Sequence, residues 1–137
     1  MQEKVPIKHL NVVTFNVRGL TDDARKSYLE KDMDKYKLDI ICLQETKINK
    51  HLDIPLDHSR FINFKPNCVH YGLGFLVNKH IEQNILNMVS VSDRICYIEI
   101  ELEEHRTMTV INVYGPTQAK VNSDTKHREE SGETDFK

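Results

Sequence analysis

The sequence predicts an α/β protein in which two β-sheets pack face to face with helices outside them. Three observations lead to this prediction. Near the start of the chain, an amphipathic stretch lies between two short apolar runs, which is the pattern of a strand, a helix and a second strand. Short strand-like runs at regular spacing follow, as in a β-sandwich. Apolar residues make up 39% of the 137 residues, enough to supply a real core.

The opening unit consists of three predicted elements. The run 9–17 is rich in valine and phenylalanine and has few polar residues, so we expect a strand covered on both faces. Residues 22–36 place apolar residues at helical spacing and predict an amphipathic helix, with Thr21 or Asp22 as its N-cap. Residues 39–45 are apolar and β-prone, and predict a second strand parallel to the first.

The second part of the chain contains short strands. They are expected at residues 60–65, 72–77, 85–91, 95–102 and 108–114. Ile98 and Ile100 alternate with glutamates, so one face of that strand should be buried and the other wet. Residues 103–106 then form the expected loop of a hairpin. We therefore assign residues 1–117 to the folded part.

The end of the chain differs in composition. Residues 118–137 contain few apolar side chains among many charged ones. Such a segment cannot bury enough apolar surface to offset the entropy of ordering. We expect a charged tail that is disordered, or the start of a helix without the surface against which it packs.

Charge and composition restrict the class of protein. The formal net charge is −2, so any contact with nucleic acid must come from a local basic patch. No apolar run approaches the roughly 20 residues that span a bilayer, and residues 1–10 lack the apolar stretch of a secretion signal. Three widely spaced cysteines suggest reduced thiols. We expect an intracellular protein, nuclear or cytoplasmic, with no membrane partner.

Three predicted strands end in polar side chains that a core strand does not need, namely Asn16, Glu45 and Tyr114. A carboxylate such as Glu45 is a hard oxygen ligand of the kind that Mg²⁺ prefers. An amide such as Asn16 can orient that carboxylate or meet a phosphate oxygen, and a phenol such as Tyr114 can donate to phosphate or position a water. Taken singly, each residue is more often structural: a turn, a solvated charge or a plug at the sandwich rim.

Four strings strengthen the functional interpretation. They are Asn-Val-Val-Thr-Phe-Asn-Val-Arg-Gly-Leu at 11–20, Asp-Ile-Ile-Cys-Leu-Gln-Glu-Thr-Lys at 39–47, Tyr-Gly-Leu-Gly-Phe-Leu-Val at 71–77 and Ile-Asn-Val-Tyr-Gly-Pro-Thr at 111–117. In this order they resemble the endonuclease/exonuclease/phosphatase superfamily, which has the deoxyribonuclease I-like fold. The resemblance implies that Glu45 is a metal ligand, that Asn16 lies at the metal and phosphate site, and that Tyr114 occupies the place of the family's tyrosine.

The resemblance also carries expectations about fold and reaction. It implies the first layer and part of the second of a four-layer α/β-sandwich, that is, the N-terminal half of the domain. It implies Mg²⁺, with Mn²⁺ as a possible substitute, and hydrolysis of phosphodiesters. The strings look most like the endonuclease domains of non-LTR retrotransposons and of craniofacial development protein 2-like sequences. The expected partner in the intact protein is therefore DNA, relatives can be fused to a reverse transcriptase, and the oligomeric state stays open.

The departures from the family pattern leave alternatives open. Apurinic endonucleases of the family carry an aspartate where this chain has Arg18, which disfavours an abasic-site enzyme. The family's later Asp-x-Asn and Ser-Asp-His motifs do not occur in the sequence. A phosphatase of phosphoinositides or sphingolipids is therefore one alternative, and a catalytically dead remnant that acts as a binding module is another. Half of a sandwich would leave sheet edges unpaired, and we expect an unstable or aggregating chain.

Overall fold

The structure is a computed structural model, and it describes residues 3–68 and 71–115. Within these residues the elements, in chain order, are β1 (Val12–Asn16), α1 (Asp23–Lys35), β2 (Ile40–Gln44), β3 (Leu52–Pro55), β4 (Ser59–Phe64), β5 (Leu73–Asn78), the 3₁₀ helix η1 (Lys79–Asn84), β6 (Ile85–Ser92), β7 (Ile95–Glu101), the 3₁₀ turn η2 (Glu103–His105) and β8 (Thr107–Val113). The predicted tail, residues 118–137, lies outside the described residues. No helix in the described part is long and apolar enough to cross a membrane.

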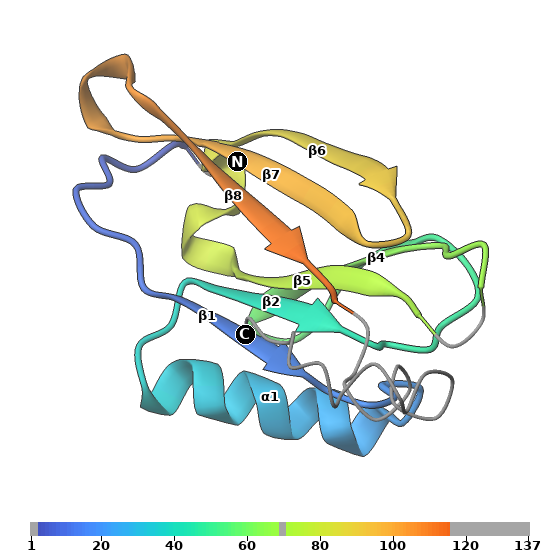
Figure 1. Ribbon diagram of the computed structural model, residues 1–137. Helices are drawn as coiled ribbons and strands as arrows, with labels where there is room; N and C mark the ends of the chain where they lie inside the picture. Colours follow the sequence, from blue (N-terminus) through green and yellow to red (C-terminus); the bar gives the residue numbers. More distant parts are fainter. Residues whose placement is uncertain (1–2, 69–70, 116–137) are drawn as a thin grey trace, which may run out of the picture.

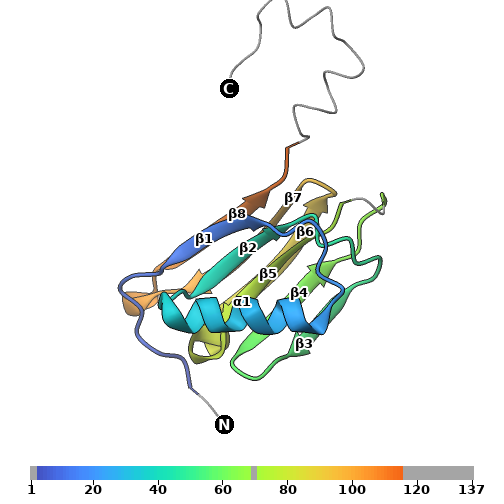
Figure 2. The same cartoon turned by 90° about the horizontal axis from the view of Figure 1, so that it is seen from below.

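The elements form three layers (Figure 1). A five-stranded sheet has the order β1-β2-β5-β4-β3, and a three-stranded sheet has the order β6-β7-β8. β1 and β2 are parallel, as predicted, and the other pairs of the five-stranded sheet are antiparallel. The three-stranded sheet covers one face of the larger sheet, and α1 runs across the other face (Figures 1 and 2). The predicted class, α/β with two packed sheets and an outer helix, is confirmed, although the smaller sheet is wholly antiparallel in its described strands.

The α-helix among the described residues begins at a capping residue and packs through one apolar stripe. The carboxylate of Asp22 accepts the backbone N–H of Ala24 at 2.8 Å, which makes Asp22 the N-cap. Leu29 and Met33 are buried against the five-stranded sheet. Tyr36 shares their spacing in the sequence, but its side chain is 60% exposed because the helix ends at Lys35.

Two apolar cores lie on opposite faces of the five-stranded sheet. One core joins the two sheets and includes Phe75 and Ile98; the other joins α1 to the sheet and includes Leu43 and Phe61. All five residues of β2 are buried, because successive side chains of β2 point alternately into the two cores. Each fully buried side chain of this size contributes about 1.5–3 kcal/mol.

The structure corrects the prediction for the first strand. We expected β1 to be covered on both faces, but β1 is an edge strand, with Val12 38%, Val13 36% and Phe15 46% exposed. An apolar run identifies a strand and does not reveal how many neighbours the strand has. The covered strand is β2. The sequence analysis also missed β3, a strand of four residues that ends at a proline, a residue that disfavours strands away from sheet edges.

Candidate active site

Asn16, Glu45 and Tyr114 lie in contact at one end of the sandwich. Asn16 ends β1 and Glu45 follows β2. Because these strands are parallel, both residues lie at the end of the five-stranded sheet where β1 and β2 terminate. Tyr114 follows β8 and comes from the other sheet. The Asn16 Nδ2 donates to Oε2 of Glu45 at 3.1 Å, and the Tyr114 hydroxyl donates to the same oxygen at 2.8 Å. Residues far apart in the sequence thus share one carboxylate oxygen.

The backbone of Glu45 has a left-handed conformation, with φ of 57°. For a non-glycine residue this costs about 1–2 kcal/mol, so the surrounding structure must hold it in place. Flanking segments do so: the N–H of Gly19 donates to the carbonyl of Glu45 at 2.7 Å, and the N–H of Lys47 donates to the carbonyl of Tyr71 at 2.9 Å. Strand alternation would turn residue 45 toward α1. The left-handed turn instead accompanies its contact with Tyr114 on the other side.

A glycine allows this loop to close. Gly72 has φ of 115°, and its carbonyl accepts the N–H of Thr46 at 3.1 Å. A Cβ at residue 72 would collide with the hydroxyl of Thr46. The side chain of Thr46 is itself fully buried and donates to Asn63. The Tyr-Gly pair that stood out in the sequence therefore seats the loop that carries Glu45.

The surroundings of Glu45 favour its charged form. Burial by itself would raise the pKa of Glu45, but the hydrogen bonds from Asn16 and Tyr114 and the positive charges of Lys47 and Arg18 lower it below its ordinary value. The pKa of Tyr114 is raised to about 12 by burial and by the adjacent carboxylate. At neutral pH the site holds a carboxylate and a neutral phenol, and the phenol keeps the O–H with which it donates to Glu45.

The oxygen atoms available at this site fit a hard divalent cation. The two donors both point at Oε2 of Glu45, and no described residue donates to its Oε1. The Asn16 Oδ1 accepts the N–H of Arg18 at 3.2 Å, so Asn16 orients the carboxylate in this arrangement. The described residues contain no group of three or more His, Cys, Asp or Glu that could hold a metal. One carboxylate with water and phosphate oxygens is the environment that Mg²⁺ accepts and that Zn²⁺ rarely uses.

Comparison with known proteins assigns the family. Residues 13–125 match the endonuclease/exonuclease/phosphatase family, which is more than half of the chain. The chain belongs to this family. The crystal structure of the AP endonuclease from Leishmania major is similar, with a TM-score of 0.60 and 16% identity over 89% of this chain. That match covers 46% of the AP endonuclease chain, so this chain spans less than half its length. No curated protein sequence matches significantly.

The sequence analysis did not identify two buried polar residues near the candidate site. Asn112 and Gln44 are 1% and 7% exposed, and both lie between the two sheets directly behind Glu45 and Tyr114. A signal was available, since each is a polar residue at a position where strand alternation predicts an inward side chain. Polar residues at such positions need partners, and the partners could not be identified before the sheets were placed on each other.

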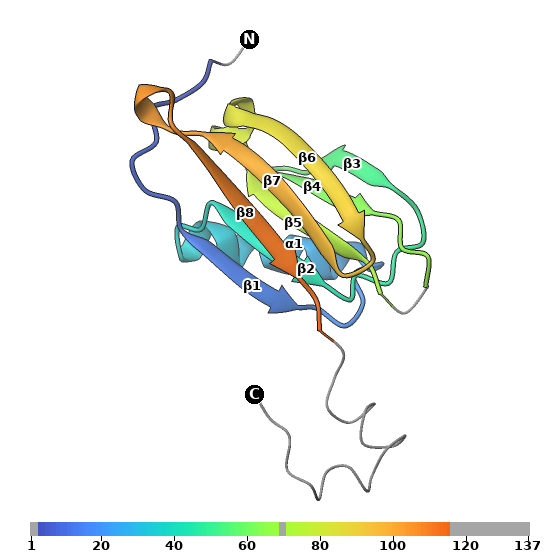
Figure 3. The ribbon, with the colours of Figure 1, turned by 45° about the horizontal axis from the view of Figure 1, so that its top comes forward.

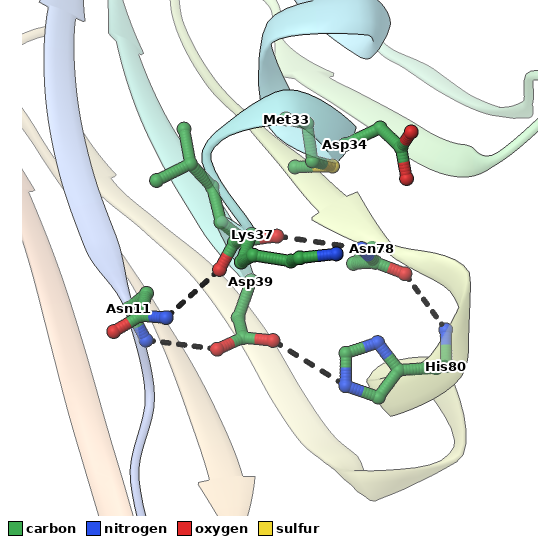
Figure 4. Close-up of a pocket in the computed structure, with 8 residues that line it drawn as sticks. Asn11, Met33, Asp34, Lys37, Asp39, Asn78 and His80 are labelled. Atoms are coloured by element: carbon green, nitrogen blue, oxygen red, sulfur yellow. Dashed lines mark hydrogen bonds and ion pairs between the residues drawn. The ribbon is translucent and has the colours of Figure 1, made fainter.

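A second polar group lies at the opposite end of β2 and is structural. Asp39 accepts the N–H of Asn11 at 2.8 Å and lies 3.4 Å from His80, beside a pocket of about 360 Å³ (Figure 4). The side chain of Asn11 donates to the carbonyl of Lys37 at 2.8 Å. These contacts tie the start of β1 to the turn after α1. They account for the placement of Asn11, Asp39 and His80 without any ligand.

Proposed function

We propose that this chain provides the metal-binding part of an Mg²⁺-dependent nuclease that hydrolyses DNA phosphodiesters, of the kind found in non-LTR retroelements. The observation that carries the proposal is the pair of hydrogen bonds on Oε2 of Glu45. They fix the carboxylate and leave its other oxygen without a hydrogen bond from the described residues, as a ligand for one cation requires. Membership of the endonuclease/exonuclease/phosphatase family supports the reaction class.

Each side chain has a role in this proposal. Glu45 would hold the cation, and Asn16 would keep the carboxylate in place. When bound, the cation supplies charge stabilisation at a phosphoryl oxygen. Tyr114, neutral at all physiological pH values, donates a hydrogen bond and can exchange its carboxylate partner for a phosphate oxygen. Lys47 and Arg18 carry positive charge close enough to Glu45 to lower its pKa, and they would attract the DNA backbone.

The nature of the site limits the activity expected from these residues alone. No Asp-x-Asn or Ser-Asp-His motif occurs in the sequence, so no partnered histidine base is present in the described site. A general base contributes roughly 10²- to 10⁴-fold in rate. We therefore expect cation binding to be readily measured and turnover by the chain alone to be slow.

Two measurements on the same samples test the proposal. Mn²⁺ serves as the probe, and its free concentration is followed by electron paramagnetic resonance in the wild-type, Glu45→Gln and Glu99→Gln proteins. Glu99 is a matched control, because it is half-buried like Glu45 and lies on β7, away from the site. We expect one site in wild type and Glu99→Gln, and a loss of at least tenfold in affinity in Glu45→Gln. Equal affinity in all three would overturn the metal assignment.

Substrate class is decided by a second assay. Supercoiled plasmid is incubated with Mg²⁺, with chelator as a control, and a small phosphomonoester is tested in parallel. Nicking that requires both Mg²⁺ and Glu45 is the expected result. Activity on the monoester without nicking would favour a phosphatase, and a folded chain that binds DNA without either activity would favour a binding module.

A further inference from the structure

Glu45 and Tyr114 belong to different sheets, so their contact depends on how the sheets are placed on each other. Glu45 follows β2 of the five-stranded sheet, and Tyr114 follows β8 of the three-stranded sheet. Figure 3 shows β8 lying across β2 toward the end that carries the site. Apolar packing holds the sheets together but has no direction, and by itself it tolerates small sliding movements. A 2.8 Å hydrogen bond between the two sheets does not tolerate them.

Asn112 joins the two sheets by directional contacts immediately behind this hydrogen bond. Its Nδ2 donates to the carbonyl of Leu43 at 3.0 Å and to the carbonyl of Gly74 at 2.9 Å. Its Oδ1 accepts from Nε2 of Gln44 at 2.8 Å. One side chain of β8 thus engages both β2 and β5 of the other sheet.

Gln44 extends the same network across the five-stranded sheet. Its Nε2 also donates to the hydroxyl of Thr14 at 2.7 Å, which reaches β1. Asn112 is 1% exposed, so its partners cannot be replaced by bulk water. A slip of the three-stranded sheet would break three buried hydrogen bonds, and each unsatisfied group costs about 1–3 kcal/mol. The network therefore selects one placement of the two sheets.

That placement is the one the site needs. Asn112 and Tyr114 are two residues apart along β8, so their side chains leave the same face of the strand about 7 Å apart. Gln44 and Glu45 are adjacent on the opposing sheet. We propose that Asn112, held by Gln44, is a positioning residue that sets the three-stranded sheet where the Tyr114 hydroxyl reaches Glu45. The positioning role stands on these contacts, and its importance for catalysis rests on the proposed function.

Asn84 provides a matched control for the test. It is also 1% exposed and makes three side-chain hydrogen bonds, to the N–H and carbonyl of Val5 and to the carbonyl of Glu101. Its side chain makes no contact with the site residues. Asn84→Ala and Asn112→Ala therefore each remove three side-chain hydrogen bonds of a buried asparagine, from different places.

The first readout needs no metal. Nuclear Overhauser contacts between the Tyr114 ring and the side chain of Glu45 are measured in wild type, Asn112→Ala and Asn84→Ala. We expect the contacts in wild type and Asn84→Ala and their loss in Asn112→Ala. If Asn112→Ala does not fold, Gln44→Met removes the hydrogen bonds of Gln44 to Asn112 and Thr14 at nearly constant volume and should weaken the same contacts. Unchanged contacts in the folded variant would overturn the proposal.

The second readout separates positioning from general stability. Mn²⁺ affinity is measured for Asn112→Ala, Tyr114→Phe and the double variant. Loss of a partner that orients a ligand typically costs 10- to 100-fold in metal affinity, and we expect a loss toward the lower end for Asn112→Ala. In the Tyr114→Phe background that loss should fall below about twofold, because the route through Tyr114 is gone. Additive effects would overturn the positioning role. Absence of Mn²⁺ binding by wild type would overturn the proposed function, while the nuclear Overhauser contacts would still decide the role of Asn112.

Discussion

The two lateral sides of the sandwich are built differently. On one side lie β3 and β6, and on the other lie β1 and β8 (Figure 3). β3 has only four residues and ends at Pro55, and Arg60 of its neighbour forms a paired salt bridge with Asp53. The pairing of β6 is interrupted by two irregularities of register. Short strands, proline, charges and bulges all oppose the addition of a further strand.

The side formed by β1 and β8 has no proline, no ion pair and no register irregularity in the described residues. Both strands pair without interruption with their neighbours, and both expose large apolar side chains. Phe15 is 46% exposed, and Ile111 and Val113 are each 59% exposed. The candidate site lies at the end of this side. One side is therefore protected against strand addition while the other can accept it, which is the physical basis for the expected tendency to aggregate.

The strongest test of this contrast compares a central strand with β1, the edge strand on the open side, which is the side formed by β1 and β8. Phe75 on β5 is fully buried, so Phe75→Ala should lower the free energy of unfolding by about 3–5 kcal/mol. Phe15 on β1 already faces solvent, and Phe15→Ala should cost less than about 1 kcal/mol. Urea denaturation followed by circular dichroism gives both values. A similar cost at both positions would show that β1 is covered in solution.

The next effect concerns the loop at the end of the open side. Gly72→Ala places a side chain at a positive φ and against Thr46, and should destabilise the chain by about 2 kcal/mol or more. Gly115→Ala is the control, because a Cβ there meets no atom within 4 Å. Thermal denaturation of the two variants, with Mn²⁺ affinity as a second readout, separates them. Equal melting temperatures would refute the role assigned to Gly72.

Self-association distinguishes the two sides directly. Phe15→Lys with Ile111→Lys places charge on both strands of the open side and should shift the weight-average mass toward that of a monomer. Leu86→Lys with Val91→Lys introduces the same charge on β6, where those side chains are 46% and 58% exposed, and should have little effect. Sedimentation velocity at several concentrations measures the difference. Equal responses would mean that net charge, and not the open edge, governs association.

The smallest expected effect is on the protected side. The hydrogen bond and charge of Arg60 lower the pKa of Asp53 below its ordinary value of 3.8. A lowered pKa adds stability above the unfolded value, and that stability is lost as pH falls through the folded value. Asp53→Asn should therefore cost less than about 1 kcal/mol at pH 7, since the pair is partly exposed. The urea midpoints of wild type and variant should converge below about pH 4. A difference between the midpoints that stays constant with pH would show that the ion pair does not cause the loss of stability.

Local patterns in the sequence were sufficient to predict the elements that depend on residues close to each other along the chain. The helix, the parallel pair β1 and β2, and the alternation of Ile98 and Ile100 with glutamates were all predicted, and Asp22 was one of two predicted caps, because periodicity and capping act within a few residues. β1 was predicted as a strand, but the prediction that both of its faces are covered was wrong. The position of a strand in a sheet depends on non-local pairing, of which a single run of residues contains no record.

For the candidate site, the sequence determined the residue types and the ends of strands at which they stand. Asn16, Glu45 and Tyr114 were singled out from their motifs before any distance was known. Only the tertiary structure decided that one oxygen of Glu45 receives both hydrogen bonds, that Glu45 has a left-handed backbone, and that Asn112 ties the sheets together behind it. The contacts of Tyr114 and Asn112 join two sheets over nearly 70 residues of chain, and their geometry is set by how the sheets stack.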